Sequence, residues 1–497
     1  MKIMDFDFNP RKIIYNPSDR ELRNLATEQG GIITQFGNLS VISKVRSRSA
    51  KFTEVILRDL NHNEVELIKE VFEYIKNIEV IQLDRTMCMN PEFKFPCRIY
   101  VDSNFARLPL MWGNTLFPPE GKEAEFTSIV LPAWPNRKVL VIPDYGLTIS
   151  LGTDYKGEIK KSMLRKLMYR VKKKNCLGLH ASSKILKIKK NDELKDVQFI
   201  FFGLSGTGKT SLSCHSHWFN YPESVIIRQD DVVILEPTRK CYGTEDSYYI
   251  KTDALEPDSQ PLLYAAAISP RAILENVMVY PYGNKVDFFD ASLTSNGRAM
   301  VKRSDVAFTD DKIDIDGVDN VVFITRRYDI VPPIAKLPPE WAAAAFMLGE
   351  SVETSAGDPE LAGQAKRVVG TNPFIIGSEA EEGNIFYDII KKNPGINCYI
   401  LNTGRIGGER GGTKISIKDS VTIIEMIARD KIKWEKDDYW GYDIPYDIPS
   451  IDLDRFYPKN YYESSMFNEI QENLRGERRK WLKQFETLNP KIRNIFD

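Results

Sequence analysis

Short apolar runs follow one another along the chain beyond residue 175. Residues 197–202 are apolar at nearly every position, and residues 224–227 and 321–324 have the same character. Continuous apolar runs of this length are typical of strands covered on both faces, as in parallel sheets. The sequence therefore predicts buried strands over these three ranges.

The first 175 residues have a different pattern. Residues 64–75 show the spacing of an amphipathic helix, and residues 139–142 form a strand-like apolar run. Residues 164–174 are strongly basic, and such a charge run is typical of a solvated helix face. The basic residues of this run are Arg165, Lys166, Arg170, Lys172, Lys173 and Lys174.

The change of pattern predicts a lobe boundary near residue 175. A chain of 497 residues is too long for one simple core, so we expect an α/β protein with two lobes, residues 1–175 and 176–497. The segment 461–485 has the pattern of a charged amphipathic helix, ended by Asn489-Pro490. It belongs to a helical tail of the second lobe, from about residue 455 to residue 497.

Charge and cysteine content narrow the class of protein. The 68 Lys and Arg residues nearly cancel the 69 Asp and Glu residues, so nothing predicts a nucleic-acid or membrane partner. The six cysteines form no CxxC pair, which favours reduced, buried thiols. The first residues lack a signal-peptide pattern, and no run approaches the ~18 apolar residues of a membrane span. These features predict a cytoplasmic protein.

The segment from Gly203 to Thr210 fits the pattern G-x-x-x-x-G-K-[ST]. Glycines allow successive backbone N–H groups to point into one concavity that holds phosphate oxygens, and the helix that follows favours the same anions. Lys209 then reaches the β- and γ-phosphates, and the Thr210 hydroxyl binds the nucleotide's magnesium. The candidate nucleotide contacts are Leu204, Ser205, Gly206, Thr207, Gly208, Lys209, Thr210 and Ser211.

A pair of acids follows the predicted strand 225–227. Asp230 and Asp231 stand at its end, before the apolar residues 232–235. A carboxylate at a strand end beside the phosphate-loop strand is what a magnesium nucleotide requires. We therefore predict that both acids bind metal.

The string from Phe201 to Ser213 resembles the kinase loop of the ATP-dependent phosphoenolpyruvate carboxykinases almost letter for letter. Other segments resemble that family's motifs in the same order, over roughly residues 40–490. They are Arg46–Lys51, Gly152–Lys161, Leu179–Ser183, Ile250–Thr252, Ser292–Arg298, Asn402–Gly404 and Ile415–Ser420. The chain is identified as a divergent member of this family.

The resemblance implies a two-lobed fold with the active site in the cleft. Its N-terminal lobe binds substrate, and its phosphate-loop lobe binds nucleotide and metal. The implied reaction converts oxaloacetate and ATP into phosphoenolpyruvate, ADP and CO2, through a metal-stabilised enolate and in-line transfer of the γ-phosphoryl group. The implied metals are Mg2+ and Mn2+, and the protein is expected to be a monomer or a small homo-oligomer.

The resemblance also assigns roles to single residues. Arg48 binds a substrate carboxylate, and Tyr155 lies near the CO2. The second cation, typically manganese, is bound by Lys161, His180 and Asp231. Lys251 and Arg298 face the γ-phosphoryl group. Lys414 and Ser420 lie in the segment on the nucleotide side.

Four departures from the family pattern leave alternatives open, the first being that apolar residues 232–235 follow Asp230-Asp231 where the family has E-H-G-W. Lys414 replaces an arginine on the adenine side, so GTP or pyrophosphate stays possible as the donor. The Gly-rich segment 404–412 is longer than its counterpart, and the lid pattern is hard to find in residues 357–373. The alternatives are a kinase of the same fold, acting on a hydroxyl of another metabolite or on a protein serine, and a nucleotide-gated binding protein without turnover.

Overall fold

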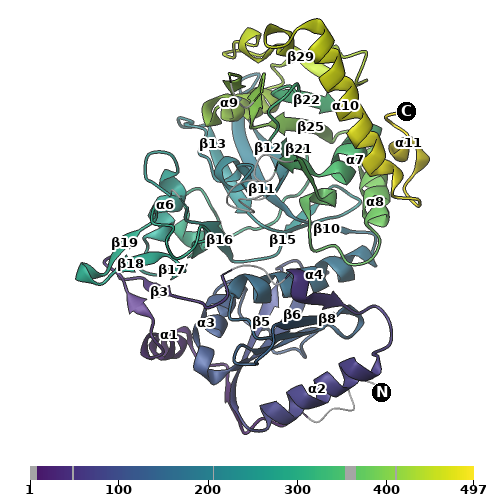
Figure 1. Ribbon diagram of the computed structural model, residues 1–497. Coiled ribbons are helices and arrows are strands. Elements are labelled where there is room, and N and C mark those ends of the chain that lie inside the picture. The colour runs from purple at the N-terminus through teal and green to yellow at the C-terminus, as the bar shows by residue number, and fades with distance from the viewer. Residues whose placement is uncertain (1–7, 47–49, 205, 254, 353–364, 409–410) are drawn as a thin grey trace. The chain divides into compact units, whose positions relative to one another are not determined.

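The computed structural model describes residues 8–46, 50–204, 206–253, 255–352, 365–408 and 411–497. The protein is α/β, with helices and several sheets (Figure 1). It divides into two compact units, here called unit 1 (Met1–Arg170 with Thr244–Ala307) and unit 2 (Val171–Gly243 with Phe308–Asp497). The single boundary expected near residue 175 does not describe this division, because unit 1 also takes Thr244–Ala307.

The larger sheet of unit 1 has seven strands of mixed direction. In spatial order these are β1 (Lys12–Tyr15), β5 (Glu79–Met87), β6 (Phe95–Asp102), β7 (Phe126–Leu131), β9 (Leu147–Leu151), β8 (Lys138–Ile142) and β4 (Thr53–Val55). The strand expected over residues 139–142 is β8, which is confirmed.

Helix α2 (His62–Ile75) confirms the helix expected over residues 64–75. Asn61 caps it by accepting a hydrogen bond from the backbone N–H of Glu64, whose side chain bonds back to the N–H of Asn61. Ile68, Val71 and Ile75 are spaced to lie on one helix face, and they pack against the strands of the larger sheet. Burying each of these side chains contributes about 2 kcal/mol.

The second sheet of unit 1 explains why Thr244–Ala307 belongs to this unit. Strand β3 (Leu39–Val41) pairs in parallel with β17 (Ile273–Glu275), so two segments more than 200 residues apart in the chain form one sheet. Nothing local in the sequence marks such a pairing. In order, the strands are β16 (Ser247–Lys251), β20 (Arg298–Lys302), β17, β3 and β2 (Ile32–Ile33).

The basic run 164–174 lies on α4 (Lys156–Lys172) and just after it. The expectation of a solvated face is wrong, because Arg165, Lys166 and Lys172 are buried and only Lys173 and Lys174 are exposed. The Lys166 ammonium donates to the carbonyl of Thr127 at 2.7 Å. Its burial lowers its pKa to about 7. Internal acceptors, which a charge pattern does not show, therefore hold these side chains inside.

Unit 2 is built on a sheet of eight strands. Their spatial order is β13 (Ser224–Gln229), β11 (Ala181–Lys190), β12 (Glu193–Gly203), β21 (Asn320–Thr325), β25 (Asn397–Asn402), β22 (Ile334–Leu337), β29 (Asp443–Asp447) and β28 (Lys433–Lys436). The three strands expected over 197–202, 224–227 and 321–324 are β12, β13 and β21, and all three are confirmed.

Strands β12, β21 and β25 are parallel neighbours. Their carboxyl ends therefore lie at the same edge of the sheet. Helices α7 (Pro339–Leu348), α8 (Glu379–Lys392) and α10 (Ser464–Lys483) lie along one side of this sheet (Figure 1). Ile200 and Phe202 of β12 join the apolar core on that side.

The helix expected over residues 461–485 is α10, and Pro490 begins a further short helix, α11 (Pro490–Arg493). The other helices are α1 (Asp19–Glu28), α3 (Arg107–Gly113), α5 (Lys209–Ser213), α6 (Pro261–Ala267) and α9 (Ile417–Ala428). The other strands are β10 (Leu177–Leu179), β14 (Val233–Leu235), β15 (Cys241–Gly243), β18 (Met278–Tyr280), β19 (Lys285–Asp287), β23 (Glu350–Val352), β24 (Ala365–Arg367), β26 (Arg405–Ile406) and β27 (Thr413–Lys414).

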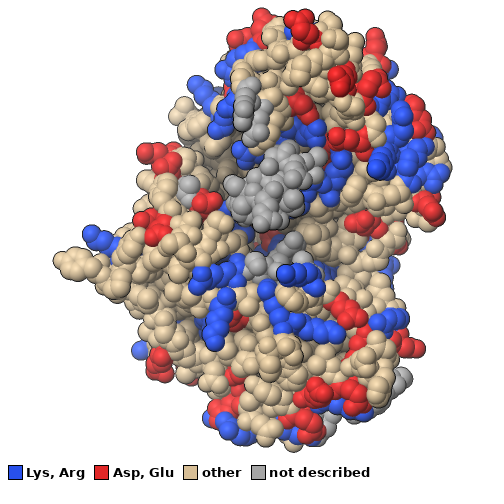
Figure 2. All heavy atoms as spheres, viewed as in Figure 1, with Lys and Arg blue, Asp and Glu red and all other residues tan. Residues whose placement is uncertain are grey.

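The distribution of charged side chains and the state of the cysteines are as the sequence predicts. Figure 2 shows acidic and basic side chains side by side around α10, as the balance of charges leads one to expect. The six cysteines, all within the described residues, are buried thiols that form no disulfide: Cys88, Cys97, Cys176, Cys214, Cys241 and Cys398. No helix within the described part of the chain combines the length and the apolar character needed to cross a membrane.

Candidate active site

The phosphate-loop motif stands between a buried strand and a helix. β12 ends at Gly203 and α5 begins at Lys209. Gly206 and Gly208 have φ values of +83° and +95°, which disfavour a side chain. At Gly203 a side chain is excluded by a steric clash, because an added Cβ would lie 2.5 Å from the Thr207 hydroxyl. The glycines are therefore required by the shape of the turn.

Polar contacts fix the middle of the loop. Thr207 is buried, and its hydroxyl donates to the carbonyl of Leu204 at 2.8 Å. The carbonyl of Thr207 accepts a hydrogen bond of 2.8 Å from the hydroxyl of Thr403, just after β25. The two parallel strands β12 and β25 thus support the loop through residues at their carboxyl ends.

A buried lysine supports the far end of α5. The Lys184 ammonium of β11 donates to the carbonyls of Leu212 and His215, at 3.0 and 2.5 Å. Complete burial lowers the pKa of Lys184 to about 7. The chain emerging from the phosphate loop is therefore attached to the sheet beneath it.

Asp230 contacts the phosphate loop. The Lys209 ammonium donates to the Asp230 carbonyl at 3.0 Å, and the Thr210 hydroxyl donates to its carboxylate at 3.4 Å. Ser213 contacts the other carboxylate oxygen at 3.5 Å. The expectation that the acids follow a strand beside β12 is wrong in detail, because β11 lies between β12 and β13. Both outer strands run antiparallel to β11, so their carboxyl ends still share one edge.

His180 and Asp231 form a pair. His180 Nε2 lies 3.2 Å from a carboxylate oxygen of Asp231, and His180 Nδ1 lies 2.8 Å from the carbonyl of Thr371. A carbonyl only accepts, so Nδ1 carries the proton in this contact. Nε2 and the carboxylate then approach as two acceptors unless a proton or a cation lies between them. This geometry fits a metal ion.

The described residues hold no group of three or more His, Cys, Asp or Glu side chains that could bind a metal ion. A cation at His180 and Asp231 would therefore need ligands of another kind. A neutral lysine, a hydroxyl group, water and phosphate are such ligands. In unit 2, the predicted ligand Thr210 carries such a hydroxyl group.

In unit 1 the predicted residues Tyr155 and Arg298 come together around Asn296. The Asn296 side chain accepts two hydrogen bonds from the Arg298 guanidinium, at 3.1 and 2.8 Å, and donates to the Tyr155 hydroxyl at 3.2 Å. Lys251 lies opposite Arg298 on the paired strands β16 and β20. Sequence reasoning gave Asn296 no role, although it lies in the segment 292–298 that carries Arg298.

The other predicted residues are placed as follows. Lys161 is half-buried on α4, and Lys414 is exposed on β27. Ser420 is buried in α9, where its hydroxyl donates to the Ser416 carbonyl of the same helix. Arg48, Ser205 and residues 357–364 of the expected lid segment lie outside the described residues.

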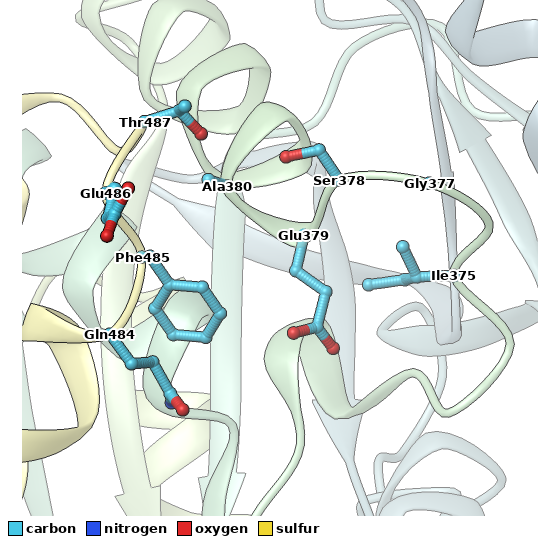
Figure 3. A pocket seen from close by; sticks show the side chains of 9 residues that line it. All are labelled: Ile375, Gly377, Ser378, Glu379, Ala380, Gln484, Phe485, Glu486 and Thr487. Carbon is cyan, nitrogen blue, oxygen red and sulfur yellow. The ribbon is translucent and has the colours of Figure 1, made fainter.

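A hollow of about 450 Å³ lies between the start of α8 and the chain that joins α10 to α11 (Figure 3). The Ser378 hydroxyl caps α8 by accepting a hydrogen bond from the backbone N–H of Glu381. Burial raises the pKa of Glu379 in its wall. No residue of the predicted site lines this hollow, so the candidate active site is the phosphate-loop region.

A family model described as phosphoenolpyruvate carboxykinase matches residues 11–454. The chain belongs to the phosphoenolpyruvate carboxykinase family. The family predicted from the sequence motifs is therefore confirmed, and the match covers parts of both compact units.

Three relatives named phosphoenolpyruvate carboxykinase (ATP) show how far the likeness extends. The protein of Aeropyrum pernix is 32% identical over 484 residues, covering 96% of this chain and 95% of that protein. One from Rhodopseudomonas palustris is 28% identical over 519 residues, covering 96% and 93%. One from a Geobacter species is 27% identical over 458 residues, covering 86% and 82%.

Proposed function

We propose that this chain is an ATP-dependent phosphoenolpyruvate carboxykinase. It converts oxaloacetate and ATP into phosphoenolpyruvate, ADP and CO2. The observation that carries this function is the family match over residues 11–454. The contacts of Lys209 and Thr210 with Asp230 agree with it, since phosphoryl transfer from a nucleotide needs a phosphate loop and a nearby carboxylate.

The proposed reaction has two steps. The bond between the leaving carboxylate and the methylene carbon of oxaloacetate breaks, which releases CO2 and leaves the electron pair in the enolate of pyruvate. The enolate oxygen then attacks the γ-phosphorus of ATP, and the bond from that phosphorus to the ADP oxygen breaks. Preorganised cations around the transferred group lower the barrier by offsetting the charge that develops.

Unit 2 supplies the nucleotide contacts. The backbone N–H groups of the phosphate loop hold phosphate oxygens, and Lys209 exchanges its contact with the Asp230 carbonyl for one with a phosphate. Lys414 and Ser420 are proposed to lie on the nucleotide side. Lysine has no planar guanidinium to stack on a base, so Lys414 by itself does not select adenine over guanine.

Two divalent cations, proposed to be Mg2+ and Mn2+, fit the acceptors of unit 2. Thr210 and Asp230 would hold the nucleotide's cation, and His180 and Asp231 would hold the second one together with Lys161. Cations bound there supply positive charge beside the reacting groups. A lysine can serve as a ligand only when neutral, so burial and the cation must lower its pKa.

Unit 1 supplies the substrate contacts. Arg48 is proposed to bind a substrate carboxylate, since a guanidinium matches its geometry. Tyr155 would lie beside the CO2, and Lys251 and Arg298 would offset charge on the γ-phosphoryl group. Because these residues belong to unit 1 and the phosphate loop belongs to unit 2, the proposed reaction requires both units. The two-lobed arrangement, the oligomeric state and the cytoplasmic location stay predictions.

The test is a coupled assay for phosphoenolpyruvate formed from oxaloacetate, with ATP, Mg2+ and Mn2+, repeated with GTP and with pyrophosphate. We expect product with ATP, and a loss of about 100-fold or more in kcat for Lys251→Ala, because one cation at the transferred group is removed. Lys302→Ala is the matched control. Lys302 lies on the neighbouring strand and pairs with Asp246, as Lys251 pairs with Asp253.

Two results would contradict the proposal. Wild-type protein that binds ATP but forms no phosphoenolpyruvate with any donor would redirect the search to kinases acting on a hydroxyl group. Binding without turnover of any acceptor would favour a nucleotide-gated binding protein.

A further inference from the structure

Two adjacent arginines follow β21, the strand that pairs in parallel with the phosphate-loop strand. Gly203 at the end of β12 is in register with Ile324 of β21. Arg326 and Arg327 therefore stand just past the carboxyl end of β21, at the level of the phosphate loop. This is the edge where parallel sheets bind ligands.

The side chains of the two arginines have different surroundings, as expected for neighbours in extended chain. Arg327 is buried and pairs with Asp329 and Glu350. Arg326 is half-buried, and its Nη1 donates to the carbonyl of Gly206 in the phosphate loop at 2.8 Å. Arg327 therefore belongs to a buried ion cluster, and Arg326 belongs to the loop.

The charge of Arg326 is not neutralised within the described part of the chain. None of the carboxylates described there pairs with it, and its Nε is buried without an acceptor. A buried donor without an acceptor costs free energy. A guanidinium has five N–H groups in a planar fork that matches phosphate oxygens, and the carbonyl of Gly206 uses only one of them.

We propose that Arg326 is an additional phosphate-binding residue of the nucleotide site. This proposal rests on the proposed function, because it assigns a further contact to the same nucleotide. Nη1 stays on the carbonyl of Gly206, and the remaining N–H groups donate to oxygens of the polyphosphate chain. Arg326 thereby adds a fixed positive charge to the loop that already carries Lys209. It recognises phosphate groups and makes no contact with the base.

The test measures the affinity of the full chain for ADP and for pyrophosphate by titration calorimetry, with Mg2+ present. A hydrogen bond to a charged group is worth about tenfold or more in affinity. We expect Arg326→Ala to weaken both ligands by about tenfold or more, to a similar extent. Arg326→Lys should fall between wild type and Arg326→Ala, because it keeps the charge and loses the fork.

Arg493→Ala is the matched control. Arg493 of α11 also donates from Nη1 to a backbone carbonyl, that of Glu486 at 2.7 Å, and it lies in the same unit. We expect it to bind both ligands as wild type does. The dependence of ADP affinity on ionic strength distinguishes a direct phosphate contact from a role limited to shaping the loop. A direct phosphate contact makes the ADP affinity of wild type fall more steeply with ionic strength than that of Arg326→Ala, whereas a shaping role leaves the two slopes equal.

Three results would overturn the proposal. The first is that Arg326→Ala binds ADP and pyrophosphate as tightly as wild type does. The second is weaker binding of ADP with unchanged binding of pyrophosphate, which would indicate a base or ribose contact. The third is an equal dependence of ADP affinity on ionic strength in wild type and Arg326→Ala. Because binding is measured without turnover, wild-type protein that binds ADP and forms no phosphoenolpyruvate would contradict the proposed function alone.

Discussion

Asn296 shows how much a single residue can organise in this protein. Its side chain oxygen accepts two hydrogen bonds from Arg298, and its nitrogen donates to Tyr155 and to the Arg46 carbonyl. One amide thus joins three segments of unit 1 that are far apart in the sequence. Because two of its partners are proposed to meet the reacting groups, Asn296 is a positioning residue.

We predict that Asn296→Ala lowers kcat/KM by about tenfold or more, mostly through kcat. The substitution removes both acceptor contacts to the Arg298 guanidinium, and each hydrogen bond to a charged group is worth about 1.5 kcal/mol or more. Steady-state kinetics with ATP varied separate the effect on kcat from that on KM.

The control is Asn77→Ala. Asn77 lies just past the end of α2, and its exposed side chain donates to the carbonyl of Glu73 in that helix. We expect unchanged kinetics. A fall in Asn296→Ala that is confined to KM would show that the amide does not position Arg298 for transfer.

At this scale the sequence predicts residues within one motif and misses those that act across segments. The strand that ends at Gly203 and the helix that begins at Lys209 are present as expected. Asn296 and Arg326 were not predicted, because Tyr155 and Gly206 are brought near them only by the fold. The burial of Lys166 was missed for the same reason, since its acceptor Thr127 lies on another element.

At the scale of elements, a buried ion cluster joins helix α10 to the two-stranded sheet of β23 and β24. Glu350 at the start of β23 contacts Arg478 of α10 at 2.5 Å and Arg367 of β24 at 2.9 Å. Arg327 lies 3.7 Å from the same carboxylate. The three arginines hold the pKa of Glu350 well below its usual value, against the effect of burial.

We predict that Arg478→Ala destabilises the protein by about 3 kcal/mol at pH 7, because it removes one partner from a buried charge. Thermal unfolding should occur about 3 °C below wild type, since the entropy of unfolding is about 2.1 cal/mol/K per residue. Since Glu350 has a depressed pKa in the folded state, its contribution is present above the unfolded pKa of about 4.3 and is lost as the pH falls further. The difference between wild type and variant should therefore shrink in acid.

Lys480→Ala removes the same charge from the exposed side of α10 and should change the melting temperature little. Equal melting temperatures for wild type and Arg478→Ala at pH 7 would show that the cluster does not stabilise α10.

The elements themselves were largely predictable. Apolar runs over 197–202, 224–227 and 321–324 are strands of the unit 2 sheet, and the amphipathic pattern of 64–75 is α2. Their order in the sheet was not, because β11 separates β12 from β13. Periodicity reports which face of an element is buried and carries no information on its neighbour.

At the scale of the whole molecule, the chain passes from unit 1 to unit 2, returns, and passes back again. The return places Lys251 and Arg298 on the sheet that also contains β3. The two cationic side chains proposed to face the γ-phosphoryl group thus belong to a different sheet from the phosphate loop. A single boundary in the sequence could not express this, because the deciding contact is the pairing of β3 with β17.

The central claim is that one enzyme couples decarboxylation to phosphoryl transfer. The most direct measurement is the stoichiometry of a single reaction with oxaloacetate, ATP and both metals, with CO2 measured as released gas and the phosphorus compounds by NMR. If the two steps are coupled, CO2, phosphoenolpyruvate and ADP form in equal amounts. ADP that appears with inorganic phosphate or another phosphorylated acceptor, and without phosphoenolpyruvate, would contradict this coupling.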